Sequence, residues 1–186
     1  MKKLLLILVL FVSGLVKSQI IDTNNFNYTL LEKMVLQKIN DYRKTKKLSE
    51  LVFSETLRVN ASVKTSTANA KKDSAFHMPP LATNLVLYRN LYNELYKITN
   101  GKCGIENPEF VGFTQNGEII CKSTDSYETY EIMTNKIFNS WMNSPKHKSI
   151  IELPYVENKS VISCSSKKSK SGKIYTTVNF ISLGYY

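Results

Sequence analysis

The sequence predicts an α+β fold in which helices pack on a small antiparallel sheet. Amphipathic helical patterns occupy the first half of the chain, and a long strand-turn-strand pattern occupies the last third. A further helix and a shorter strand pair lie between them, so helices and strands are interleaved. The 186 residues contain no repeat, linker or low-complexity tract. We therefore expect one domain with one core.

The first 18 residues predict a secretory signal peptide. A short basic start precedes a wholly apolar run from Leu4 to Val12, and small or uncharged residues follow up to Ser18. The run is too short for a membrane span, which needs roughly 20 apolar residues, and no later stretch comes close. We expect a soluble domain over residues 28–186, with no transmembrane segment, exported to the periplasm or the medium.

The chain is basic, with 25 Lys and Arg against 15 Asp and Glu. Removal of the signal peptide, with its three lysines, lowers the formal net charge from +10 to +7. The basic residues form short runs without interleaved aromatic side chains, which predicts solvated helix ends and loops. We expect a monomer with no nucleic-acid partner. The runs are Arg43/Lys44/Lys46/Lys47, Lys71/Lys72, Lys146/Lys148 and Lys167/Lys168/Lys170/Lys173.

Two amphipathic helices open the predicted domain. Thr29 and Glu32 fit a capping box for a helix that runs to Tyr42. Ser54 caps the second helix after a short extended connection. One side of this second helix is small, which predicts close packing. Its members are Leu57, Ala61, Lys64 and Ala68.

The middle of the chain predicts a loop, a helix and a hairpin. The loop over residues 73–80 carries His77, and a tyrosine-rich helical pattern follows over residues 81–99. The pair Asn116-Gly117 then predicts a tight turn between two short strands, because Asn-Gly is a strong hairpin signal. In this interpretation Glu118 begins the second strand.

Three cysteines in an exported chain favour one disulfide and one leftover thiol. Connectivity cannot be read from the sequence. Cys103 and Cys121 flank the predicted hairpin, so we favour their pairing, which would stabilise the fold by about 3 kcal/mol in the chain-entropy model. A nucleophilic cysteine is the alternative, although no cysteine lies beside a helix start or a histidine.

The last part of the chain predicts a helix followed by a long hairpin. Asp125 and Glu128 form a second capping pair. The helix that they open carries Trp141, interpreted as a core anchor, and breaks just before His147. Two alternating strands then flank a Lys/Ser/Gly turn over residues 167–173, which predicts an antiparallel hairpin.

Only two histidines occur, so any histidine-based chemistry must use His77 and His147. Each also has a structural interpretation. His77 would satisfy a loop carbonyl or a helix end. His147 lies between two lysines whose positive charge lowers the pKa of its imidazole, which suits either a neutral ligand or a surface group.

The order of these motifs resembles the CAP superfamily of cysteine-rich secretory proteins, antigen 5 and pathogenesis-related 1, also called the SCP domain, in its bacterial secreted branch. The matching features follow one another along the chain. They are the helix pair over residues 39–61, His77, Gly117-Glu118, the Trp-Met-x-Ser-x-x-His segment over residues 141–147, and the terminal hairpin over residues 161–180.

The resemblance implies an α-β-α sandwich with a cleft holding His77, Glu118 and His147, sometimes with a bound metal and with no general catalytic role. Two imidazoles and a carboxylate suit a divalent cation such as zinc. The family's Gly-Glu-Asn is here Gly117-Glu118-Ile119. Ser144 stands where the animal and plant branches place a second glutamate.

Three functions remain open at this point. The leading hypothesis is a secreted CAP domain that binds a small ligand, a glycan or a protein in its cleft without catalysis. The second is a metal-dependent hydrolase that uses His77, Glu118 and His147, although neither a His-Glu-x-x-His helix nor a Gly-x-Ser-x-Gly elbow occurs. The third is a secreted inhibitor or interaction module acting on an extracellular protein.

Overall fold

The computed structural model describes residues 19–78, 85–105 and 111–185. The predicted signal peptide lies outside this part of the chain. Within it, no helix combines the length and hydropathy of a membrane-spanning segment. The elements are α1 (Tyr28–Thr45), β1 (Val52–Phe53), α2 (Glu55–Leu57), the π-helical turn η1 (Arg58–Ser62), α3 (Val63–Lys72), α4 (Leu85–Ile98), β2 (Val111–Thr124), α5 (Tyr130–Met142), α6 (Pro145–Ile151), β3 (Ser160–Lys168) and β4 (Lys173–Tyr185).

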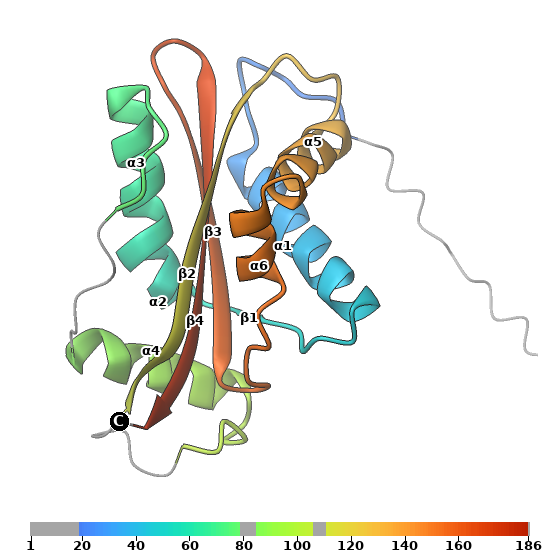
Figure 1. Ribbon diagram of the computed structural model, residues 1–186. Helices are drawn as coiled ribbons and strands as arrows, with labels where there is room; N and C mark the ends of the chain where they lie inside the picture. Colours follow the sequence, from blue (N-terminus) through green and yellow to red (C-terminus); the bar gives the residue numbers. More distant parts are fainter. Residues whose placement is uncertain (1–18, 79–84, 106–110, 186) are drawn as a thin grey trace, which may run out of the picture.

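One four-stranded sheet, in the order β1-β3-β4-β2, lies between two groups of helices (Figure 1). Helices α1, α5 and α6 cover one face, and α2, η1, α3 and α4 cover the other. This arrangement confirms the predicted α+β sandwich. The sheet is mixed, because the short edge strand β1 pairs in parallel with β3 while the other pairs are antiparallel.

The predicted terminal hairpin forms as β3 and β4, but the hairpin predicted at Asn116-Gly117 does not. Strand β2 continues through these residues and pairs with β4 from Val111 to Thr124, with one register shift between Phe113 and Gln115. Glu118 therefore lies inside a long strand. The glycine serves a close contact instead: a Cβ at Gly117 would lie 2.6 Å from Cγ2 of Ile150 in α6.

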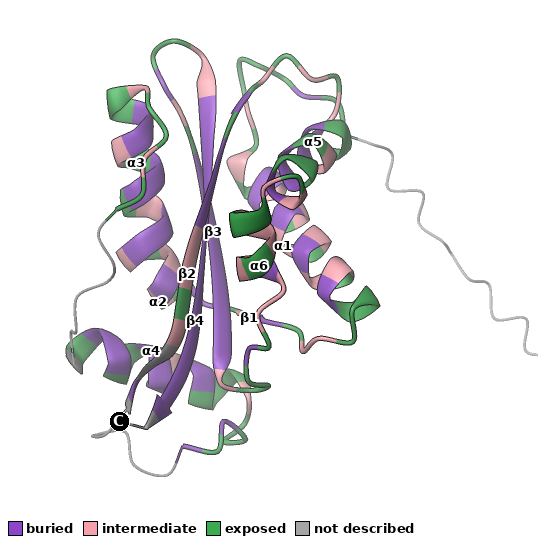
Figure 2. Ribbon diagram, in the orientation of Figure 1, coloured by how far each residue is buried: buried purple, intermediate pink, exposed green. Residues whose placement is uncertain are grey.

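Each face of the sheet has its own apolar cluster, and the strands between them are buried (Figure 2). Cys121 belongs to the cluster under α1 and α5, whereas Cys103 belongs to the cluster under α4. The predicted Cys103 to Cys121 disulfide is absent, and these two cysteines and Cys164 are buried free thiols. Without a hairpin at Asn116, nothing brings the first two cysteines to one side of the sheet.

Helix starts differ from the predicted caps by a few residues. Asn27, not Thr29, caps α1, and its side chain accepts a hydrogen bond from the Leu30 amide. Thr129 caps α5, while Asp125 forms an ion pair with Lys168. Ser54 caps α2 as predicted. Short polar side chains two to four residues apart compete for the same role, so the helix is predictable and its first residue is not.

The chain ahead of α1 already packs on the domain. Ile21 is buried in the cluster under α1, and its amide donates to the Glu128 carbonyl. The Gln19 carbonyl accepts from the Tyr130 amide. Within the described residues, contacts with the domain therefore extend ahead of α1 as far as Gln19.

Candidate functional site

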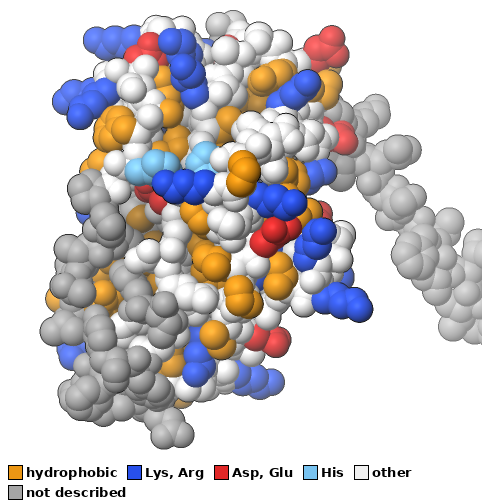
Figure 3. Space-filling model, in the orientation of Figure 1, with side chains coloured by type: hydrophobic (Ala, Val, Ile, Leu, Met, Phe, Trp, Pro, Cys, Tyr) orange, Lys and Arg blue, Asp and Glu red, His pale blue; other side chains and the backbone are white. Residues whose placement is uncertain are grey.

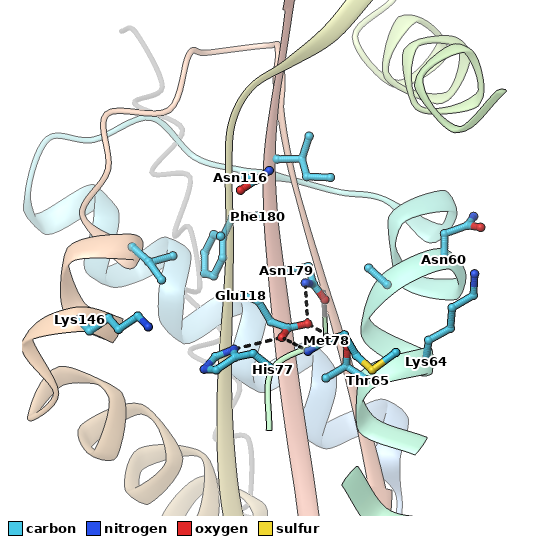
Figure 4. A pocket seen from close by; sticks show the side chains of 14 residues that line it. Asn60, Lys64, Thr65, His77, Met78, Asn116, Glu118, Lys146, Asn179 and Phe180 are labelled. Carbon is cyan, nitrogen blue, oxygen red and sulfur yellow. Dashed lines mark hydrogen bonds and ion pairs between the residues drawn. The ribbon is translucent and has the colours of Figure 1, made fainter. Parts of the chain in front are cut away.

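A cavity of about 470 Å³ crosses the β2 edge of the sheet, between α6 on one side and η1 and α3 on the other (Figure 4). Strands β2 and β4 form its floor, and the loop after α3 crosses it. Its lining residues are Asn60, Ala61, Lys64, Thr65, His77, Met78, Asn116, Gly117, Glu118, Lys146, Ile150, Asn179, Phe180 and Ile181. We call this cavity the Glu118 cleft.

The carboxylate of Glu118 is the hub of the cleft (Figure 4). Its Oε2 accepts hydrogen bonds from the Thr65 hydroxyl, at 2.8 Å, and from the Asn179 amide, at 3.1 Å. Its Oε1 lies 3.1 Å from Nδ1 of His77 and accepts from the Met78 backbone amide at 3.3 Å. Four groups thus converge on one side chain, which is only 15% exposed. The carboxylate links the strand floor to α3 and to the His77 loop.

The hydrogen-bond network continues under α3 through small polar side chains. Glu118 and Asn179 face each other across β2 and β4. Asn179 Oδ1 accepts from the Ser62 hydroxyl, which lies 2.8 Å from the Ser163 hydroxyl. Farther along, Ser66 donates to Ser165. The inward face of this helix is therefore a buried polar seam, whereas Lys64, placed on that face by the sequence, is exposed.

His77 and His147 lie beside each other at the surface, with ring centroids 6.2 Å apart (Figure 3). When Nδ1 of His77 donates to Glu118, Nε2 is left as the acceptor of the neutral ring. His147 follows the end of α5, as predicted, and lies in the first turn of the short helix α6; it does not line the cleft. Burial, and then the positive charges of His77 and Lys146, lower the pKa of His147.

These donors fit the predicted metal shell poorly. Both oxygens of Glu118 already accept two hydrogen bonds each, so the carboxylate would have to release donors before it could bind a cation. Glu118 instead orients the His77 ring, as carboxylates do behind ligating histidines. Nowhere in residues 19–78, 85–105 and 111–185 do three His, Cys, Asp or Glu side chains form a group that could hold a metal ion.

The α6 wall of the cleft is anchored by Arg43, which the sequence placed in a solvated basic run. Arg43 is fully buried. Its Nη1 donates to the carbonyls of Ile151 and Leu153, and its Nε donates to Ser49. The guanidinium also lies 5.1 Å from the ring centroid of Tyr155. Arg43 thereby ties the end of α6 to α1, while burial lowers the pKa of its guanidinium.

A second hollow, of about 680 Å³, opens between α1, β1 and η1. Glu32 closes its inner end, where Oε1 accepts from the Ser166 amide at 2.7 Å and Oε2 contacts Arg58. Burial raises the pKa of Glu32. Asn40 likewise makes two hydrogen bonds with the backbone of Leu51. These α1 side chains satisfy backbone groups at the open edge of the sheet, which is a structural role.

The model of the cysteine-rich secretory protein family, CAP, matches residues 36–180 of this chain. The chain belongs to the CAP family. The match covers η1, α3, His77, strands β1 to β3 and β4 as far as Phe180, so every residue that lines the Glu118 cleft except Ile181 lies within the matched region. A comparison with curated proteins gave no match.

Three solved structures resemble this CAP domain. An outer surface protein from Borrelia burgdorferi aligns at 19% identity with a TM-score of 0.54, covering 89% of this chain and 98% of that chain. A cysteine-rich secretory protein from Staphylococcus aureus aligns at 15% identity and a TM-score of 0.49, covering 84% of this chain and 39% of that chain. An extracellular SCP-domain protein from Bacillus anthracis aligns at 18% identity and 0.44, covering 83% and 41%. At 19% identity, the first alignment shows a shared fold.

In this CAP domain, His77 and Glu118 are in direct contact, and His147 is their neighbour. Sequence reasoning missed Thr65 and Asn179, which supply half of the donors to Glu118. Asn179 carried a usable signal, because it is a polar residue among apolar neighbours in a predicted buried strand. Lys146 was grouped with solvated charges and Lys64 with the inward face of its helix, and nothing local marks either as a cleft residue.

Proposed function

We propose that this chain is an exported CAP-domain protein that binds a small ligand in the Glu118 cleft without transforming it. One observation carries the proposal. The central carboxylate, the residue best suited to acid-base work, is occupied by four donors that hold the cleft walls together. The remaining cavity, of about 470 Å³, falls within the usual range for small-molecule sites, roughly 300–1,000 Å³.

The composition of the lining supports binding of an organic molecule. Ile150, which is half-buried, and Met78, which is 37% exposed, supply accessible apolar surface above the buried side chains of Phe180 and Ile181. Asn60 and Asn116 add amide groups that can donate or accept. Apolar walls with a few polar groups are typical of ligand pockets. The N-terminal signal pattern supports export, and an exported protein would meet its ligand outside the cytoplasm.

The test uses N-phenyl-1-naphthylamine, a neutral apolar dye that fluoresces when bound. We expect one-to-one binding with a micromolar dissociation constant, and loss of that binding in Asn116→Trp. Asn116 is exposed on β2 and lines the cleft, so an indole there fills the cavity without entering the core. Tyr96→Trp, at an exposed position of α4, is the matched control and should bind as the wild type does. Unchanged binding by Asn116→Trp would overturn the assignment.

The metal-dependent hydrolase and the interaction module each predict a different result. Zinc titration by calorimetry tests the first: micromolar one-to-one binding that disappears in His77→Ala/His147→Ala would support a metal centre. An interaction module predicts that Asn116→Trp is harmless to the biological activity while surface substitutions abolish it. The geometry favours neither alternative. The hydrogen bonds already made by Glu118 weigh against a metal centre, and the open cavity weighs against a function that uses the outer surface alone.

A further inference from the structure

We propose that the Glu118 cleft selects small organic anions, whose negative group is attracted by the ammonium groups of Lys64 and Lys146 on its two sides while the apolar part rests on Ile150 and Met78. The inference rests on the proposed function and names the ligand class of the same cleft. It assigns a recognition role to two lysines that belong to no catalytic or metal motif of the sequence.

The two lysines reach the cleft from opposite walls. Lys146 comes from the start of α6 and Lys64 from the start of α3, and both line the cavity (Figure 4). Both side chains are exposed, and neither forms an ion pair within the described part of the chain. Two unpaired cations that flank one hollow attract a ligand with one negative group.

The acidic residue of the cleft does not neutralise these lysines. The Glu118 oxygens accept from Thr65, Asn179 and Met78 and contact His77. The negative charge of Glu118 therefore lies behind the His77 loop, where these hydrogen-bond donors surround it. Apart from His77, the titratable residues that line the cleft are two lysines and one carboxylate, so the cleft carries a net positive charge.

Apolar side chains of the cleft determine the chemistry of the uncharged part of the ligand. Ile150 lines the cavity on the α6 side and Met78 lines it on the loop side, while Phe180 and Ile181 lie buried beneath the floor. The phenyl ring of Phe180 is itself fixed by stacking on Tyr155, with centroids 5.8 Å apart. Such walls offer little to a small inorganic anion or to a fully hydroxylated sugar. An aromatic or aliphatic acid satisfies both the lysines and the apolar surface.

Two dyes distinguish the contribution of the anionic group to the binding affinity from that of the apolar rings. 8-Anilinonaphthalene-1-sulfonate and N-phenyl-1-naphthylamine share the same ring system and differ in the sulfonate. We expect the sulfonate dye to bind the wild type about tenfold more tightly, because an ion pair with one lysine and the net positive charge of the cleft both favour the sulfonate. In Lys64→Met/Lys146→Met the two dyes should bind equally, with the neutral dye unaffected. Lys71→Met/Lys148→Met, on the same two helices but outside the cleft, should keep the tenfold difference.

Competition by 1-naphthylacetate and 1-naphthyl phosphate then distinguishes the source of the charge. Displacement by either, weakened in the Lys64→Met/Lys146→Met variant, supports the proposal and identifies a carboxylic acid or a phosphate ester. Equal binding of both dyes by the wild type would overturn the anion preference while leaving the small-ligand function intact. Failure of both dyes to bind would instead overturn the proposed function.

Discussion

The two walls of the Glu118 cleft are held by different forces. The α6 wall rests on the apolar cluster under α1 and α5 and on the buried guanidinium of Arg43. The opposite wall includes the His77 loop, in which His77 and Met78 are exposed and are held by hydrogen bonds to Glu118. Burial makes the first wall part of the core. At His77 and Met78 the second wall depends on one carboxylate, so this part of it can adjust to a ligand at small cost.

The largest expected effect is on the α6 wall. Arg43→Met should destabilise the protein by about 3 kcal/mol, because three carbonyls, of Ser49, Ile151 and Leu153, lose their charged donor in a buried site. Thermal unfolding measures this as a fall in Tm of about 10 °C. Lys44→Met, at the exposed neighbouring position, is the control and should change stability by less than about 0.5 kcal/mol. Equal effects of the two substitutions would mean that Arg43 does not anchor α6.

A smaller effect is expected on the loop wall. Glu118→Gln replaces one acceptor oxygen with an amide that faces hydrogen-bond donors, which should cost about 2 kcal/mol. Hydrogen exchange at the Met78 amide should accelerate, because that amide donates to Glu118. The Phe76 amide donates to Asn69 and should exchange as before. If both amides accelerate together, the loop is held by something other than the carboxylate.

The contact between the floor and the α6 wall predicts a third, more local effect. Gly117→Ala places a methyl group 2.6 Å from Ile150 Cγ2 and should cost about 1 kcal/mol. Ile150→Ala removes the opposing methyl group, so the double variant should be more stable than the sum of the single losses predicts. A double-mutant cycle by urea unfolding measures this coupling. Strict additivity would show that the two residues do not touch.

The smallest expected effect is the pH dependence from His147. Its pKa is lowered in the folded protein, so below the ordinary histidine pKa of 6.5 the unfolded chain binds protons more readily than the fold does. Stability from this residue is complete above that pH and declines as the pH falls through it. His147→Gln should therefore reduce the loss in urea midpoint between pH 7.5 and pH 5.5. An unchanged pH profile would contradict the lowered pKa.

Local sequence patterns predicted the elements far better than the contacts between them. The periodicity of α1 and α4 and the alternation in β3 and β4 are visible in the sequence because they reflect nearest-neighbour geometry. Gly117 was misread because a turn and a close long-range contact both require glycine, and only the fold distinguishes them. Arg43 was misread for a similar reason, since two of its three acceptors lie more than 100 residues away.

In the candidate site, too, some residues were predictable from the sequence and their contacts were not. The resemblance to CAP proteins predicted a cleft with His77, Glu118 and His147, and the fold brings His77 onto Glu118. It could not predict that Thr65 and Asn179 occupy the other oxygen of that carboxylate. Those residues have no motif, because hydroxyl and amide donors are supplied by many local sequences and are selected by position alone.

The most direct test of the account is a ¹H-¹⁵N NMR titration of the protein with 8-anilinonaphthalene-1-sulfonate. Ligand in the Glu118 cleft should shift amides in three segments that meet only there, at Asn60 to Thr65, His77 to Met78 and Lys146 to Ile150. Shifts confined instead to Leu36 and Phe53, which line the hollow between α1 and β1, would place the ligand elsewhere and contradict the account.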